Sequence, residues 1–134
     1  MDIKSIEKDV ETFWRHTYAQ PFIDKDAGKY ADAFGFPCVI RAEEMPRTAF
    51  RNRDELLPYV TEMLQRAQKT SWHTSTMDTM IVSVMEENVA LVRVIASRFD
   101  ANGKKLCRVY GTYTVNRDQG KWRMVSIFGG FMAD

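Results

Sequence analysis

The sequence predicts one α+β domain that spans residues 1–134, and the order of its segments is the main reason. Helical periodicity is confined to the first half of the chain, whereas the second half contains long strand-like segments separated by short turns. Helices followed by antiparallel hairpins are typical of α+β folds, not of alternating βαβ units. The length of 134 residues, with 45% apolar and 28% charged residues, fits a single globular domain.

The composition argues against several classes of function. Lys and Arg number 19 and Asp and Glu 18, and a net charge of +1 does not favour a nucleic-acid-binding protein. No apolar run approaches the roughly 20 residues of a membrane span, and the N-terminus lacks the apolar region of a signal peptide. Two cysteines and two histidines do not suggest a disulfide framework or a zinc site. We therefore expect a cytoplasmic protein with no nucleic-acid partner, membrane segment, metal or cofactor.

The first helix is predicted from apolar residues that recur three and four positions apart, as on one face of a helix. This stripe comprises Ile3, Ile6, Val10, Phe13, Trp14, Thr17 and Tyr18. Pro21 is expected to end or kink the helix, because proline lacks the N–H that a helix interior needs. A short second helix is expected over residues 26–34, with Gly35 as its stop.

A third helix is predicted over residues 54–69. Asn52 and Glu55 have the spacing of a capping box. Pro58 would then lie deep in the helix, so a start at residue 54 fits the sequence equally well.

Strands are predicted before this helix and throughout the second half of the chain. They span residues 36–42, Thr48–Phe50, 74–85, Val89–Phe99, 106–115 and 121–128. The segment 90–96 has apolar residues on both faces, whereas a strand with one wet face alternates. Three helices in so small a protein can cover only one face of a sheet. We therefore expect the other face to pack against a second copy of the chain in a homodimer.

Four stretches of sequence resemble the nuclear transport factor 2-like superfamily, within it the SnoaL-like polyketide cyclases and the ketosteroid isomerases. They are the first-helix pattern that ends in Tyr18, residues 26–40 (DAGKYADAFGFPCVI), residues 53–56 (RDEL) and residues 120–125 (GKWRMV). The resemblance implies a cone-shaped, curved antiparallel sheet packed with three helices from the N-terminal half. It also implies a homodimer and a mostly apolar pocket inside the cone. One such fold hosts isomerases, cyclases, dehydratases, hydrolases and transport modules, so it does not decide function.

The ketosteroid isomerase mechanism needs a tyrosine, an aspartate base and a protonated aspartate. Tyr18 matches the position of the tyrosine on the first helix. The position of the base corresponds to Ala42, with Glu43 next to it, and that of the protonated aspartate to Gly111. Two of the three groups are therefore missing, and classical ketosteroid isomerase activity is not expected.

Tyr18 and His73 are the candidate catalytic residues. His73 opens the long strand after the third helix, and histidine is the usual acid–base group at neutral pH; the alternative is a strand-end histidine bonded to backbone or water. Tyr18 continues the stripe from Trp14, so its buried hydroxyl needs a partner, either a ligand or a backbone carbonyl. Asp78, inside the same predicted strand as His73, either acts as a base or faces solvent.

Candidate ligand-binding residues are those on the faces that the resemblance turns toward the pocket. They are Trp14, Tyr30, Cys38, Ile40, Arg93, Tyr113, Met124, Ser126 and Phe128. Arg93 has apolar neighbours, so it needs a ligand carboxylate, the acids Glu43 and Glu44, or water reached by snorkelling. Arg98 is interpreted as a charge on the sheet surface.

Three functions are compatible with these observations. The preferred hypothesis is a protein that binds a small, partly apolar molecule inside the cone. The second is an isomerase, cyclase or dehydratase in which His73 acts as acid or base, Tyr18 stabilises a developing oxyanion and Arg93 orients an acidic group. The third is a protein-interaction module whose interior is filled by its own aromatic side chains.

Overall fold

The computed structural model describes residues 1–42 and 44–133, and its elements follow the predicted order. The helical elements are α1 (Ile3–Thr12), η1 (Phe13–Ala19), α2 (Gln20–Ile23), α3 (Ala27–Asp32) and α4 (Arg53–Gln68). The strands are β1 (Phe34–Arg41), β2 (Thr48–Phe50), β3 (Thr74–Glu86), β4 (Val89–Phe99), β5 (Lys105–Asp118) and β6 (Lys121–Phe131). The predicted α+β class is confirmed.

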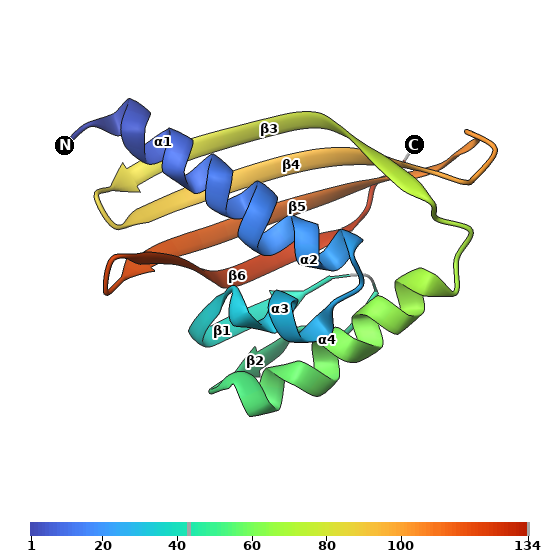
Figure 1. Cartoon of the computed structure of the whole chain (residues 1–134), viewed down its shortest axis with the longest axis horizontal. Coiled ribbons are helices and arrows are strands. Elements are labelled where there is room, and N and C mark those ends of the chain that lie inside the picture. Colours follow the sequence, from blue (N-terminus) through green and yellow to red (C-terminus); the bar gives the residue numbers. More distant parts are fainter. Residues whose placement is uncertain (43, 134) are drawn as a thin grey trace.

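The strands form one curved sheet in the order β2-β1-β6-β5-β4-β3. β1 runs parallel to β6, and the other neighbouring pairs are antiparallel. Figure 1 shows the N-terminal helix lying across the long strands, with α3 and α4 beside β1 and β2. We call the face of the sheet under these helices the inner face and the opposite one the outer face. Within the described part of the chain, no helix is long and apolar enough to cross a membrane.

The first helix continues through Pro21 instead of ending before it. α1, η1 and α2 follow one another without a break, and the Gln20 N–H donates to the Arg15 carbonyl five residues back, as in a π-helix. Pro21 lies in the first turn of α2, where a missing N–H is tolerated. The buried residues of η1 are Phe13, Trp14 and Tyr18.

The structure also defines the start of α4 and the end of α3. The Asn52 side chain caps α4 by accepting a hydrogen bond from the Glu55 N–H at 2.9 Å, so the earlier start is correct. Pro58 lies inside α4 and has no N–H to donate to the Asp54 carbonyl four residues earlier. Both residues are exposed to solvent. Gly35 does not stop the second helix but lies in β1.

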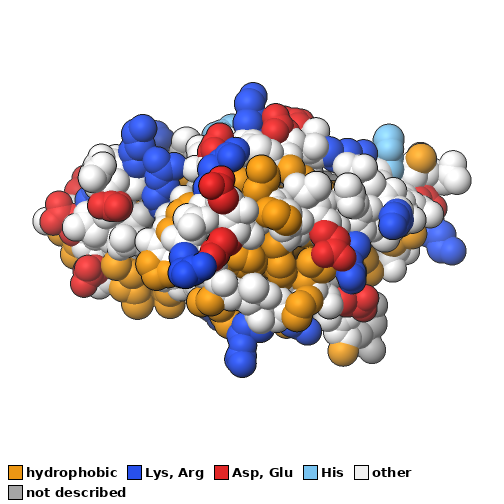
Figure 2. Space-filling model, turned by 90° about the horizontal axis from the view of Figure 1, so that it is seen from below, with side chains coloured by type: hydrophobic (Ala, Val, Ile, Leu, Met, Phe, Trp, Pro, Cys, Tyr) orange, Lys and Arg blue, Asp and Glu red, His pale blue; other side chains and the backbone are white. Residues whose placement is uncertain are grey.

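The inner face of β4 is opposite to the predicted one. Val92 and Val94 are buried beneath the helices, whereas Leu91 and Arg93 are exposed on the outer face. Alternate residues of a strand point to opposite faces, and a charged side chain such as Arg93 is rarely buried without a partner. The expectation that Arg93 points into the pocket is therefore wrong. Figure 2 views the molecule from another side, that of β2 and α4, where hydrophobic side chains also reach the surface between charged ones.

A β-bulge in β6 reverses the predicted orientation of Ser126 and Phe128. The pairing of β6 with β5 shifts at Val125, which is an extra residue in β6. One extra residue moves every later side chain to the other face. Consequently Met124 and Ile127 are buried on the inner face, whereas Phe128 is exposed on the outer face.

Candidate functional site

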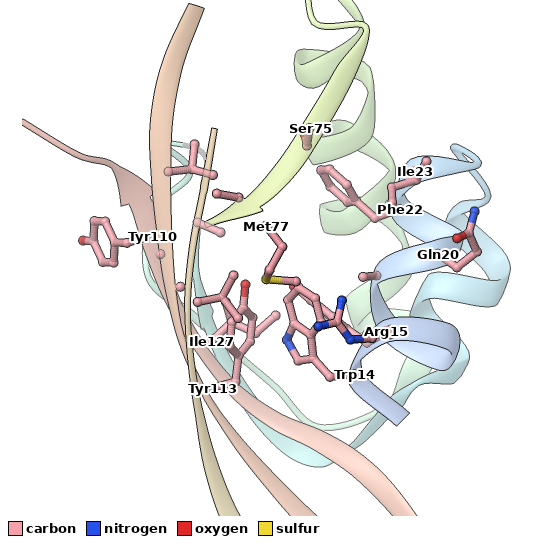
Figure 3. A pocket seen from close by; sticks show the side chains of 18 of the residues that line it. Trp14, Arg15, Gln20, Phe22, Ile23, Ser75, Met77, Tyr110, Tyr113 and Ile127 are labelled. Carbon is pink, nitrogen blue, oxygen red and sulfur yellow. The ribbon is translucent and has the colours of Figure 1, made fainter. Parts of the chain in front are cut away.

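A cavity of about 440 Å³ lies between the N-terminal helices and the inner face of the sheet. Figure 3 shows Trp14 and Phe22 approaching it from the helical side, and Met77, Tyr113 and Ile127 from the strands. Its lining is mostly aromatic and aliphatic. A volume of this size is within the range of about 300–1,000 Å³ that is typical of small-molecule sites.

Four aromatic side chains form the deep end of the cavity, which we call the aromatic floor: Trp14, Tyr18, Tyr30 and Tyr113. The ring centroid of Tyr18 lies 5.5 Å from that of Trp14, 5.1 Å from that of Tyr30 and 5.3 Å from that of Tyr113. The ring planes are tilted or edge-on, which are the favourable arrangements for aromatic pairs. The floor is therefore a packed cluster with Tyr18 at its centre.

The Tyr18 hydroxyl accepts a hydrogen bond from the Tyr30 hydroxyl at 2.9 Å. The partner of the Tyr18 hydroxyl is thus another side chain, whereas the sequence predicted a ligand or a backbone carbonyl. Burial raises the pKa of Tyr18 well above its ordinary value, and the neighbouring Tyr113 and Tyr30 raise it further. Tyr18 consequently stays a neutral hydroxyl at physiological pH and is suited to hydrogen bonding, not to proton abstraction.

Gly111 on β5 makes room for the Tyr113 ring. A Cβ atom at position 111 would lie 2.5 Å from Tyr113 Cζ and closer still to the hydroxyl oxygen. Any larger residue at this position would push Tyr113 out of the aromatic floor. The absence of a side chain at Gly111 therefore shapes the cavity.

The outer end of the cavity combines two further aromatic rings with a cation. The ring of Phe22 lies 5.5 Å from that of Trp72, and the Arg98 guanidinium lies 4.5 Å from the Trp72 ring centroid. Arg98 is only 7% exposed, so its interpretation as a surface charge is wrong. The signal that would have revealed it is its position on the same face of β4 as Val94 and Ala96.

The structure brings only some of the predicted ligand-binding residues to the cavity. Those that line it are Trp14, Tyr30 and Tyr113, together with Tyr18. Three others are fully buried in the core and do not line the cavity: Cys38, Ile40 and Met124. Burial raises the pKa of the Cys38 thiol to about 11, so this cysteine is a poor nucleophile at neutral pH. The remaining three, on the outer face, are Arg93, Ser126 and Phe128.

The structure does not bring His73 to the cavity either. His73 is exposed before β3, and its backbone N–H donates to the Phe99 carbonyl at 2.8 Å. Asp78 lies at a bulge in β3, where it accepts a hydrogen bond from the Ser97 hydroxyl at 2.5 Å. This bond lowers the pKa of the Asp78 carboxyl, which is exposed, so Asp78 is a surface carboxylate.

Acidic groups are absent from the cavity wall as far as the described residues show it. Glu43, the residue beside the position of the isomerase base, lies outside the described residues. Residues 1–42 and 44–133 contain no group of three His, Cys, Asp or Glu side chains that would suit a metal ion.

Comparison with known proteins identifies the family. The pattern of the family described as NTF2-like protein (DUF6841) matches residues 7–130. The chain belongs to the NTF2-like proteins. No curated protein gives a significant match.

Solved structures of NTF2-like proteins agree with this fold. An NTF2-like protein of unknown function from Pseudomonas putida KT2440 is 13% identical, with a TM-score of 0.76 over 98% of this chain and 88% of that one. A proposed dehydratase of the NTF2-like family from Streptomyces avermitilis is 14% identical, with a TM-score of 0.75 over 98% and 99%. A ketosteroid isomerase-like protein from Erwinia carotovora atroseptica SCRI1043 is 14% identical, with a TM-score of 0.74 over the whole of both chains. At these identities the likeness concerns the fold alone.

Among NTF2-like proteins, the ketosteroid isomerases provide the sharpest test of chemistry, because their mechanism names three groups. Tyr18 lines the cavity of this chain, as that mechanism requires of the tyrosine. The positions of the two acids correspond to Ala42 and Gly111, which also line the cavity but have no carboxyl group. Of these three positions, only that of Tyr18 has the side chain that the isomerase mechanism requires.

Proposed function

We propose that this NTF2-like protein binds a small, mostly apolar molecule in the cavity between its helices and its sheet. The observation that supports this most is the 440 Å³ cavity with its lining of aromatic and aliphatic side chains. Apolar surface gains roughly 25 cal/mol for each Å² removed from water, so such a wall favours a ligand of matching character. The buried hydroxyls of Tyr18 and Tyr30 provide a few polar contacts at the deep end.

The other two hypotheses receive less support. A catalytic pair of Tyr18 and His73 needs both side chains at one site, and His73 is exposed away from the cavity. A filled interior would leave no space beside Trp14 and Tyr113, whereas both line the cavity. The cytoplasmic location stays a prediction.

The first test asks whether the purified protein retains a molecule. Native mass spectrometry of the protein as isolated, followed by the same sample denatured, is expected to show an added mass that is lost on denaturation. The mass itself would indicate the class of ligand.

A binding test uses 2-isopropenylnaphthalene, an apolar probe without a hydrogen-bonding group, titrated into ¹⁵N-labelled protein and followed by amide chemical shifts. Ala96→Trp fills the cavity from β4, and we expect it to weaken binding at least about tenfold. Ile95→Trp adds the same ring on the outer face of β4 and should leave binding unchanged. An absence of both a retained molecule and probe binding would contradict the proposed function.

A further inference from the structure

The indole N–H of Trp14 is an unpaired donor within the cavity wall. Trp14 is 7% exposed, and its Nε1 atom has no hydrogen-bond partner among the described residues. A buried donor without a partner costs about 1–3 kcal/mol, so buried N–H groups are nearly always bonded. This donor lies in a residue that lines the cavity, and a bound molecule is the partner that the site can offer.

The surroundings of Trp14 explain why the protein itself does not satisfy this donor. The indole packs at 5.5 Å from the Tyr18 ring and at 5.6 Å, edge-on, from the Tyr113 ring. Figure 3 shows the indole between the helix and the strands, opposite Tyr113 and Ile127. The neighbours are therefore mainly ring faces and aliphatic carbon, which accept hydrogen bonds poorly.

Trp72, at the outer end of the same cavity, provides a contrast. Its Nε1 donates to the Thr74 carbonyl at 3.1 Å and to the Ser75 hydroxyl at 2.8 Å. Both tryptophans line the cavity, but of the two only Trp14 has an N–H without a partner among the described residues. Its Nε1 atom is itself covered, so a ligand oxygen reaches it when a neighbouring ring such as that of Tyr113 shifts.

We propose that Trp14 Nε1 donates a hydrogen bond to a carbonyl oxygen of the bound molecule, and that the ligand is an uncharged, planar carbonyl compound. This inference rests on the proposed function and specifies which end of the ligand enters first. The carbonyl lies at the aromatic floor and the apolar body extends toward Phe22 and Trp72.

The chemistry of the floor supports an uncharged acceptor. The rings that contact Trp14 belong to Tyr18 and Tyr113, both uncharged side chains. Arg15 also lines the cavity, and Figure 3 shows it beside Trp14, but its guanidinium is already paired with Glu11 at 3.0 Å. The guanidinium of Arg98 lies at the other end of the cavity, over the Trp72 ring. A carboxylate at the aromatic floor would therefore lose its hydration and compete with Glu11 for Arg15, which costs more than burying a neutral oxygen. A carbonyl oxygen needs no charge and accepts in the plane of its own group.

The experiment compares two probes of nearly equal shape, 2-acetylnaphthalene and 2-isopropenylnaphthalene, in which a C=CH₂ group replaces the C=O group. Both are titrated into ¹⁵N-labelled protein, and the three indole N–H resonances are followed. Trp14→Phe identifies the Trp14 resonance by its loss. We expect the ketone to bind about tenfold more tightly than the alkene and to move the Trp14 indole proton downfield, since one hydrogen bond contributes about that factor.

Two variants separate the donor from the ring. Trp14→Phe should remove the preference for the ketone, so that both probes bind with equal affinity. Trp72→Phe removes an indole whose N–H is already bonded, and should keep the tenfold preference while weakening both probes alike.

The outcomes distinguish this inference from the proposed function. If both probes bind equally to the unaltered protein and the Trp14 resonance does not move downfield, the donor role is overturned while the binding function stands. If neither probe binds and no molecule is retained on isolation, the proposed function fails and the inference fails with it. The resonance is read in the unaltered protein, so the test does not depend on the folding of Trp14→Phe.

Discussion

Both faces of the long strands have large apolar side chains, but the surroundings of the two faces differ. On the inner face, Val92, Val94 and Ile127 are buried under the helices and contribute to the core or the cavity wall. On the outer face, Leu91 and Phe128 are equally apolar but have no described element above them. The difference is that the helices cover only the inner face. A charge alone does not mark the outer face, because Arg93 lies on the outer face of β4 whereas Arg98 is buried on its inner face.

The outer face is nevertheless unusually apolar for a solvated surface. Its large hydrophobic side chains are on four adjacent strands, and they are Ile81 (42% exposed), Leu91 (39%), Tyr110 (38%) and Phe128 (40%). The register aligns Ile81 with Arg93, Arg93 with Thr112, and Thr112 with Phe128 across the sheet. Exposed apolar patches of this kind are typical of interaction surfaces.

The largest expected effect compares two neighbouring residues of β6. Ile127→Ala should lower the free energy of unfolding by about 2–5 kcal/mol, because Ile127 is buried on the inner face. Phe128→Ala, measured at low protein concentration, should lower it by only about 0.5 kcal/mol. Urea unfolding followed by circular dichroism measures both. Equal losses would show that the bulge at Val125 does not set the orientation of Phe128.

The second prediction concerns a partner for the outer face. We expect a homodimer that buries this face, and Phe128→Asp should weaken it by about 2 kcal/mol, or about 30-fold in dissociation constant. Sedimentation equilibrium measures the change. Ile3→Asp is the control, because Ile3 is an exposed apolar residue on α1. A protein that is monomeric at every accessible concentration would contradict the dimer.

The third prediction changes the inner face without adding charge. Gly111→Ala should destabilise the fold by about 1–3 kcal/mol, since the new methyl group overlaps Tyr113 and forces it out of the aromatic floor. The same variant should weaken binding of 2-isopropenylnaphthalene. Thr112→Val, on the exposed outer face beside it, should change neither property. If Gly111→Ala is as stable as the original and binds equally well, Tyr113 has room to move and Gly111 does not shape the cavity.

Local pattern was enough to predict most of this fold. The helix stripe that ends in Tyr18, the cap at Asn52 and the strand Thr48–Phe50 all depend on neighbours within a few residues, and each is present in the structure. The exceptions at Pro21 and Gly35 also have local causes, namely the π-helical turn before one and the early end of α3 before the other.

The orientation of side chains was harder to predict than the elements themselves. The bulge at Val125 exists only in the pairing of β6 with β5, so nothing within β6 announces it. The face of Arg93 was predicted from the resemblance, although its neighbours on the opposite face, Val92 and Val94, are both apolar. The extent to which Arg98 is buried and the volume of the cavity both depend on tertiary packing. Trp14 and Tyr18 were found because both lie on the helix stripe that packs against the sheet.

The smallest expected effect concerns how deeply the inner face is shielded from water. Because the pKa of Tyr18 is raised in the folded protein, above pH 10 the unfolded chain ionises this tyrosine while the folded chain keeps it protonated. Above the ordinary tyrosine pKa, the free energy of unfolding should therefore fall with pH more steeply in the unaltered protein than in Tyr18→Phe, by about 1.4 kcal/mol per pH unit. Below pH 9 the two proteins should show no such difference. Urea unfolding between pH 8 and 11 measures this slope. Parallel curves for the unaltered protein and Tyr18→Phe would mean that water reaches the aromatic floor, and the contrast between the two faces would then hold for packing but not for solvation.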